Sequence, residues 1–252
     1  MVQAAIDHAV SRFATARRVT VLTGAGVSAA SGVPTFRGDA GLWRQFRPEE
    51  LATAAAFARD PALVWEWYDW RRTLIAACPP NRAHHVLADW STRRPGVTLI
   101  TQNVDGLHER AGTARLTCLH GSIWTLRCWR ACGTPDWTNY DVPLSPCPPR
   151  CPSCGGLARP GVVWFGETLD PAELRLATEA CVCDVFMVVG TSAVVHPAAG
   201  LADIARAHGA YLIEINPETT PVSDAVDVSI RGAAEIVLEA FDRWPLERPT
   251  VA

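Results

Sequence analysis

Residues 19–38, VTVLTGAGVSAASGVPTFRG, hold the elements that decide the fold of this 252-residue chain. The β-branched and aliphatic residues at 19–23 predict a buried strand. Small residues at 24–29 follow, and they allow a tight turn whose backbone can approach a ligand closely. A strand, a glycine turn and a helix N-terminus together present N–H groups to a phosphate. Pro-Thr-Phe-Arg-Gly at 34–38 departs from a simple dinucleotide-binding fold and indicates less common nucleotide chemistry.

Strand-like and helix-like patterns alternate along the rest of the chain. Such an alternation is typical of an α/β fold with a parallel sheet covered on both faces. Ligands of these sheets bind at the carboxyl ends of the strands, where this sequence places small and polar residues. We therefore expect a Rossmann-like sheet domain. Its further strands are predicted at 97–101, 185–191, 211–215 and 226–230, and its helices at 81–92, 171–180, 197–208 and 232–241.

Two stretches interrupt this alternation. Residues 40–78 hold two helical patterns in a row, and residues 124–160 are rich in Cys, Pro and Gly without apolar periodicity. Both are predicted to be inserts that form a smaller domain beside the sheet, within one unit spanning 1–252. The larger domain then comprises 1–39, 79–123 and 161–252.

Composition excludes several classes of protein. The net charge of −3 gives no reason to expect direct binding of nucleic acid. No apolar run approaches the roughly 20 residues that span a bilayer, and the N-terminal region lacks the apolar core of a signal peptide. We expect a soluble, cytoplasmic monomer that does not bind membranes. All 23 basic residues are arginine, so any chemistry on lysine takes place on another molecule.

Five of the nine cysteines fall within residues 128–154, which indicates a metal site rather than disulfides. Cys128 and Cys132 form one close pair, and Cys151 and Cys154 form another. Two such pairs can place four thiolates around a tetrahedral zinc ion with no open position, so the predicted Zn²⁺ is structural. Cys147 is an alternative ligand, although the knuckle-like Cys-Pro-Ser-Cys sequence favours the other four.

Seven motifs occur in an order that resembles the sirtuins, the NAD-dependent protein-lysine deacylases. The resemblance covers about residues 20–240. The motifs are GAGVSAASGVPTFRG, TQNVDGLH, LHGS, the two cysteine pairs, RPGVVWFGE, GTSAVVHPAA and EINPE. The resemblance implies that NAD is consumed: an acyl oxygen attacks the ribose C1′, nicotinamide leaves, and lysine is freed with 2′-O-acyl-ADP-ribose.

The same resemblance implies roles for individual residues. His120 would be the general base that takes a proton from a ribose hydroxyl, and Asn103 would take part in catalysis beside it. His196 would line the cofactor site, whereas His8, His84, His85, His108 and His208 are expected to be structural. The residues expected to bind NAD are Gly24, Ala25, Gly26, Ser28, Phe36, Arg37, Gln102, Asn103, Asp105, Gly190, Thr191, Ser192, Glu214 and Asn216.

Two further segments bear on the substrate. The segment Val162, Val163, Trp164, Phe165, Gly166 and Glu167 is β-prone and would pair with the backbone of an acyl-lysine peptide. On the helix predicted at 61–77, Tyr68 and Arg71 lie three residues apart on one face. They resemble the Tyr-x-x-Arg pair of sirtuins that remove acidic acyl groups, with the small Ala52 keeping the pocket wide. The next arginine, Arg72, is expected to be an ordinary surface residue.

The resulting hypothesis is a desuccinylase and demalonylase, with glutaryl and weak acetyl removal also in range. A general deacetylase or a mono-ADP-ribosyltransferase on the same fold is an alternative. A dehydrogenase fits less well, because the acidic residue expected about 20 positions after the glycine turn falls in the helical context of Glu49 and Glu50. A zinc-module binding protein would explain the cysteines but not His120.

Overall fold

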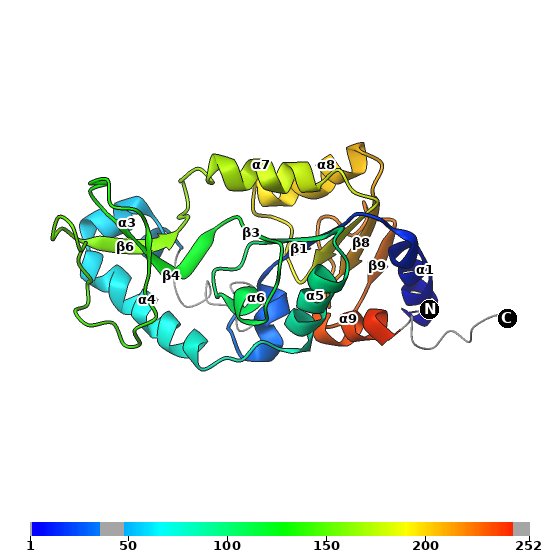
Figure 1. Cartoon of the computed structure of the whole chain (residues 1–252), viewed down its shortest axis with the longest axis horizontal. Coiled ribbons are helices and arrows are strands. Elements are labelled where there is room, and N and C mark those ends of the chain that lie inside the picture. The colour runs from blue at the N-terminus through cyan, green and yellow to red at the C-terminus, as the bar shows by residue number, and fades with distance from the viewer. Residues whose placement is uncertain (1, 36–47, 244–252) are drawn as a thin grey trace.

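The computed structural model describes residues 2–35 and 48–243. A six-stranded parallel sheet with the order β3-β2-β1-β7-β8-β9 forms the larger part (Figure 1). This confirms the predicted Rossmann-like α/β fold. The strands are β1 (Val19–Thr23), β2 (Val97–Thr101), β3 (Leu116–Cys118), β7 (Val185–Val189), β8 (Tyr211–Ile215) and β9 (Val228–Ile230).

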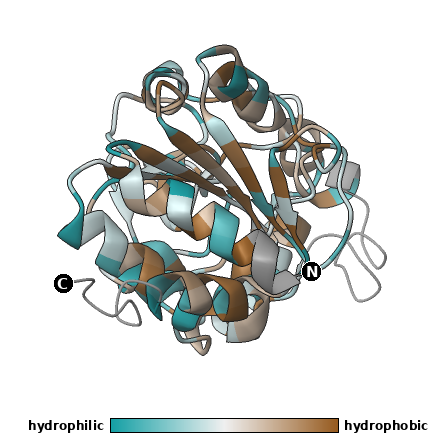
Figure 2. Cartoon of the chain, turned by 90° about the vertical axis from the view of Figure 1, so that its right-hand side faces the viewer, coloured by the Kyte–Doolittle hydropathy of each residue, from teal (hydrophilic) through white to brown (hydrophobic). Residues whose placement is uncertain are grey.

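The central strands β1 and β7 are buried throughout because both faces of the sheet are covered. In β7, Met187 faces one hydrophobic cluster and Phe186 faces another. Helices α1 (Val2–Thr15), α5 (Arg82–Arg93) and α9 (Ala234–Arg243) cover the first face, and α7 (Pro171–Ala180) with α8 (Leu201–Ala207) covers the second. Figure 2 shows the hydrophobic strands between these two helical layers.

The helices of this domain match the predicted ranges closely. Asn81 caps α5 by accepting from the N–H of Ala83, so the helix begins at Arg82. The region predicted as one helix at 197–208 divides into the 3₁₀ helix η3 (Ala198–Gly200) and α8. The turn after β1 forms another 3₁₀ helix, η1 (Ala25–Ser31), rather than an α-helix. A short helix, α6 (Leu107–Arg110), follows β2.

The smaller domain combines helices with an antiparallel sheet of order β5-β4-β6. These strands are β4 (Gly121–Cys128), β5 (Trp137–Thr138) and β6 (Ala158–Val162), so the sheet includes residues just outside 124–160. The helices are α2 (Pro48–Leu51), α3 (Ala54–Arg59) and α4 (Pro61–Ala76). A separate hydrophobic cluster rich in aromatic residues, including Phe57, Trp65 and Trp164, joins α3 and α4 to this sheet.

Arg72 is not the surface residue that the sequence predicts. Its side chain is 0% exposed and lies 4.9 Å over the ring of Trp124. Its guanidinium donates to the carbonyl oxygens of Ile123, Asn139 and Asp141 at 2.8, 2.8 and 3.0 Å. The prediction was wrong because helical spacing cannot show that the loop at 139–141 folds back onto this part of α4.

Over residues 2–35 and 48–243, no helix is both long and apolar enough to cross a membrane.

Candidate active site

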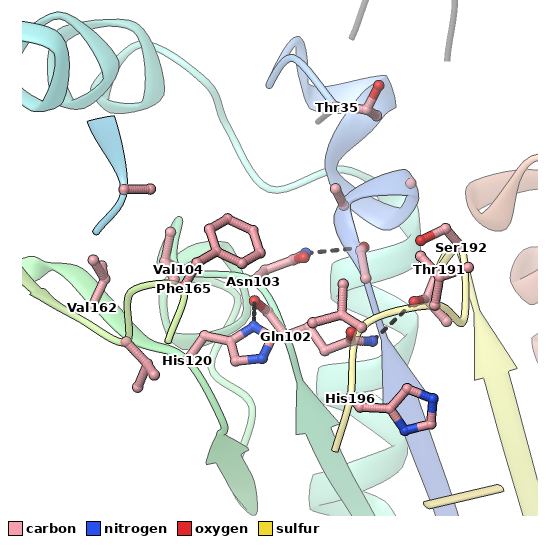
Figure 3. A pocket seen from close by; sticks show the side chains of 18 of the residues that line it. Thr35, Gln102, Asn103, Val104, His120, Val162, Phe165, Thr191, Ser192 and His196 are labelled. Carbon is pink, nitrogen blue, oxygen red and sulfur yellow. Dashed lines mark hydrogen bonds between the residues drawn. The ribbon is translucent and has the colours of Figure 1, made fainter. Parts of the chain in front are cut away.

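A cavity of about 710 Å³ lies at the carboxyl ends of the central strands and extends toward the smaller domain (Figure 3). Most residues predicted to form the site line it, although they come from distant parts of the chain. They are Gly24, Ala25, Gly26, Ala52, Tyr68, Arg71, Gln102, Asn103, His120, Val162, Val163, Trp164, Phe165, Gly166, Glu167, Gly190, Thr191, Ser192 and Asn216. His196 also lines the cavity, as expected.

The glycine turn packs directly against the end of β7. The N–H groups of Gly24 and Gly26 donate to the carbonyl oxygens of Val189 and Gly190 at 3.1 and 2.8 Å. A Cβ on Gly26 would lie only 2.8 Å from the Gly190 oxygen, so the backbones can approach this closely only without a side chain. The two glycines therefore bring the end of β7 and the start of η1 together on one wall.

Asn103 has a fixed orientation at the centre of this wall. Its Nδ2 donates to the backbone oxygen of Gly24 at 3.1 Å and to Ser28 Oγ at 3.2 Å. A backbone carbonyl only accepts, so the amide nitrogen must face Gly24. Both amide hydrogens are used there, and Oδ1 is the atom that Asn103 offers to a ligand in the cavity.

Ser28 and Asp105 lie behind this wall and do not line the cavity. Ser28 Oγ donates to Asp105 Oδ2 at 2.7 Å, and Asp105 Oδ1 accepts from the N–H of Leu107 at 2.9 Å, which caps α6. Burial raises the pKa of Asp105, while these two hydrogen bonds lower it. In this structure Ser28 therefore supports Asn103 directly, and Asp105 supports it through Ser28.

Two buried histidines complete this support. The N–H of Asn81 donates to Nδ1 of His84 at 3.2 Å, so Nε2 carries the proton and faces Ser28 Oγ at 3.3 Å. His108 Nε2 lies 3.0 Å from Thr23 Oγ1. Burial lowers the pKa of His84 to about 3 and that of His108 to about 4, so both rings are neutral near pH 7. His84 is structural, as expected, but its contact with Ser28 was missed, because the surrounding sequence shows only a helical pattern.

His120 lies in the link between β3 and β4 and has the geometry of a general base. Its Nδ1 is 2.9 Å from the backbone oxygen of Gln102 (Figure 3). Since that oxygen only accepts, the neutral ring carries its proton on Nδ1 and keeps the lone pair on Nε2. Burial lowers the pKa of His120, and the bond to Gln102 opposes this shift. The neutral form that can accept a proton is therefore favoured at neutral pH.

Glu214 is fully buried and does not line the cavity, in contrast to its neighbour Asn216. Its carboxylate accepts from the hydroxyls of Thr220, Ser223 and Ser229 at 2.5, 2.7 and 2.6 Å. Glu214 thus holds the loop after β8, which supplies cavity residues that the sequence analysis missed. These are Glu218, Thr219, Thr220 and Pro221.

Tyr68, Arg71 and Ala52 meet at the end of the cavity formed by the smaller domain. The guanidinium carbon of Arg71 lies 4.9 Å from the ring centroid of Trp67 and 6.0 Å from that of Tyr68. Burial lowers the pKa of Arg71, and the Tyr68 and Asp105 side chains oppose the shift. An arginine remains charged under such conditions, so this end of the cavity carries a positive charge among aromatic rings.

The segment at 162–167 runs along the cavity but is a strand only as far as Val162. The N–H of Val163 donates to the His120 oxygen and that of Phe165 donates to the Ala52 oxygen, both at 2.9 Å. These two bonds fix the segment between the base and the pocket end near Tyr68.

The four predicted zinc ligands form a compact group away from the cavity. The sulfur atoms of Cys128, Cys132, Cys151 and Cys154 lie within 4.8 Å of one another. A tetrahedral Zn²⁺ with bonds of about 2.3 Å needs sulfur atoms that close, so the group fits a structural zinc ion. Cys147 does not belong to this group, which agrees with the sequence prediction. Phe36 and Arg37, two predicted cofactor-binding residues, lie outside the described residues.

The comparisons with known proteins agree with this geometry. Residues 24–197 match the Sir2 family. A protein of Aquifex aeolicus (strain VF5), named NAD-dependent protein deacylase, is 52% identical over 222 residues, which cover 88% of this chain and 92% of that protein. The structure of a Sir2 homologue in complex with NAD is 46% identical, with a TM-score of 0.88 and coverage of 94% and 93% of the two chains. Sir2Af2 bound to a myristoylated histone peptide is 35% identical, with a TM-score of 0.78 and coverage of 98% and 100%.

Proposed function

Because this chain belongs to the Sir2 family, we propose that it is an NAD-dependent protein-lysine deacylase whose preferred substrates carry succinyl or malonyl groups. NAD-dependent protein deacylation is the activity in the name of the Aquifex relative, and the cavity described above fits it. Membership of this family favours a deacylase over the dehydrogenase and the zinc-module binding protein that the sequence analysis considered. The preference for acidic acyl groups rests on this chain's own residues.

Arg71 is the observation that carries the proposal. Its guanidinium lines the same cavity as His120, although it is only 6% exposed. An arginine fork can meet a carboxylate with two parallel charge-assisted bonds. The terminal carboxylate of a succinyl or malonyl group can accept these bonds. An acetyl group ends in a methyl group and offers no acceptor for the guanidinium.

Tyr68 and Ala52 support the same preference. Burial raises the pKa of Tyr68, while the nearby Arg71 lowers it, and the net shift is upward. The phenol is therefore protonated at neutral pH and can donate to a carboxylate. Ala52 contributes only a methyl group to the wall, which leaves room for a chain longer than acetyl. Removal of glutaryl groups follows from the same features.

The other cavity residues have separate roles in the reaction. NAD supplies the ribose carbon that accepts the acyl oxygen as nicotinamide leaves. Asn103 presents its Oδ1 to this region, and the wall built by Gly24 and Gly26 receives the phosphates. His120, neutral with its lone pair on Nε2, takes the proton from a ribose hydroxyl. The segment at 162–167 would bind the backbone of the acyl-lysine peptide.

The test is a peptide panel with one lysine carrying acetyl, malonyl, succinyl or glutaryl. Purified zinc-loaded protein and NAD are added, and kcat/KM is measured from the release of nicotinamide and free lysine peptide. The proposal predicts higher values for succinyl and malonyl than for acetyl. A higher value for acetyl would identify a general deacetylase instead. Transfer of ADP-ribose to protein without release of free lysine would identify a mono-ADP-ribosyltransferase.

A further inference from the structure

The hydroxyl of Tyr68 has a hydrogen-bond partner that the Tyr-x-x-Arg pattern does not include. The indole Nε1 of Trp164 donates to Tyr68 Oη at 2.9 Å. The two residues are 96 positions apart in sequence, and both are at most 2% exposed. An indole N–H only donates, so the phenol oxygen must be the acceptor in this bond.

This bond determines what the hydroxyl can do in the cavity. One lone pair of Tyr68 Oη is bound by the indole, and the single O–H proton is left for an acceptor in the cavity. A carboxylate is such an acceptor, because an ionised carboxylate has no proton to donate. We propose that Trp164 is a specificity-determining residue, which orients the Tyr68 hydroxyl as a donor toward acidic acyl groups. The inference rests on the proposed function and adds a residue to it.

Arg159 and Glu167 hold Trp164 in the position that this bond requires. The guanidinium carbon of Arg159 lies 3.5 Å over the Trp164 ring centroid. Arg159 Nη1 and Nη2 donate to the two carboxylate oxygens of Glu167 at 2.5 and 2.9 Å. Glu167 Oε2 also accepts from the backbone N–H of Trp164 at 2.9 Å. The carboxylate of Glu167 is therefore bound within the protein, where it helps to position Trp164.

The remaining contacts of Trp164 make its place in the wall rigid. Its ring packs against Phe57, with ring centroids 5.4 Å apart, and against Trp129 at 6.5 Å. Arg159 Nη2 donates to the backbone oxygen of Val162 at 2.9 Å, which fixes the chain just before Trp164. A change to phenylalanine would keep an aromatic ring in this position, remove the N–H donor and reduce the volume of the side chain.

The test uses Trp164→Phe, Tyr68→Phe and the double variant, and compares the ratio of kcat/KM for succinyl and acetyl peptides. Loss of one oriented hydrogen bond should lower this ratio about fivefold in Trp164→Phe. In the Tyr68→Phe background, Trp164→Phe should lower it by less than about twofold, because the hydroxyl is already absent. An equal fall in both backgrounds would overturn the inference.

A second variant and a second measurement distinguish the proposed role of Trp164 from a simple folding defect. Glu167→Gln should lower the same ratio, whereas Glu179→Gln on the exposed face of α7 should not. In the NMR spectrum, the indole N–H signal of Trp164, assigned by its loss in Trp164→Phe, should shift in Tyr68→Phe. An unchanged signal would overturn the bond itself. If the wild-type protein does not prefer succinyl to acetyl, the proposed function fails; if that preference persists in Trp164→Phe, only this inference fails.

Discussion

His120 Nδ1 lies 2.9 Å from the backbone oxygen of Gln102, and this one contact defines the base of the active site. It fixes the tautomer of the ring, because a carbonyl oxygen can only accept. It also couples the base to the strand end that carries Asn103. The lone pair on Nε2 is therefore available in the cavity before any substrate binds.

Replacement of His120 by alanine should lower kcat for every acyl peptide by about a hundredfold or more, since the general base is lost. The measurement is the rate of nicotinamide release with succinyl and acetyl peptides. The matched control is His208→Ala, because that residue is the exposed C-cap of α8 and its ring bonds to the Ile204 oxygen outside the cavity. Activity of His120→Ala near the wild-type rate would contradict the assignment.

The pH dependence of kcat/KM should show the same base. Burial lowers the pKa of His120 from 6.5, and the base acts in its neutral form. Activity should therefore fall as the pH decreases, with the midpoint of this acidic limb below pH 6.5. A pH series with a saturating supply of NAD measures it. A midpoint clearly above 6.5 would show that another group controls the reaction.

Buried His108 should make the protein less stable at low pH. Its pKa in the folded state is about 4, so below about pH 6.5 the unfolded chain binds a proton that the folded protein does not. The free energy of unfolding should fall by about 1.4 kcal/mol per pH unit from this group between those values. Urea unfolding from pH 7 to 4.5 measures the free energy of unfolding at each pH. His108→Leu should reduce the slope of this free energy against pH by about 1.4 kcal/mol per pH unit. His208→Leu is the control. If His108→Leu shows the same slope of unfolding free energy against pH as the wild-type protein, the prediction is contradicted.

Removal of zinc should destabilise the smaller domain. Cys151→Ser should lower the bound zinc well below one ion per chain and lower the melting temperature, because a structural zinc contributes folding free energy. Cys147→Ser, outside the four-cysteine group, should keep both values. Metal analysis and thermal unfolding of the two variants measure this. Loss of zinc in Cys147→Ser would show that Cys147 is a ligand.

Arg72→Met should destabilise the protein without a change in metal content. Three backbone carbonyls would lose their donor, so we expect a loss of about 3 kcal/mol or more in the free energy of unfolding. Denaturant unfolding compares this variant with Arg59→Met, which changes an exposed arginine of α3. Equal stability of the two variants would contradict the structural role of Arg72.

The sequence predicted the parallel sheet except for its short edge strand β3, together with the covering helices and the zinc ligands, because these depend on local periodicity and spacing. Cavity residues such as Gly24, Gln102 and Asn216 could be expected together, since they follow strand ends that meet at one edge of a parallel sheet. Tyr68 and Arg71 came from the resemblance to the sirtuins, not from strand positions. It could not show that the carboxylates of Asp105 and Glu214 bond within the protein, because their hydroxyl partners lie in other segments. The burial of Arg72 and the bond from Trp164 to Tyr68 likewise depend on how the inserts fold against each other.

The ratio of kcat/KM for succinyl and acetyl peptides, in wild-type protein and in Arg71→Met, tests the central claim most directly. The proposal predicts a ratio well above one in the wild type and a fall of about tenfold or more in Arg71→Met, because a charge-assisted bond to the carboxylate is lost. Arg59→Met, at an exposed site of the same domain, should keep the wild-type ratio. A wild-type ratio below one, or an equal loss of both activities in Arg71→Met, would contradict the claim.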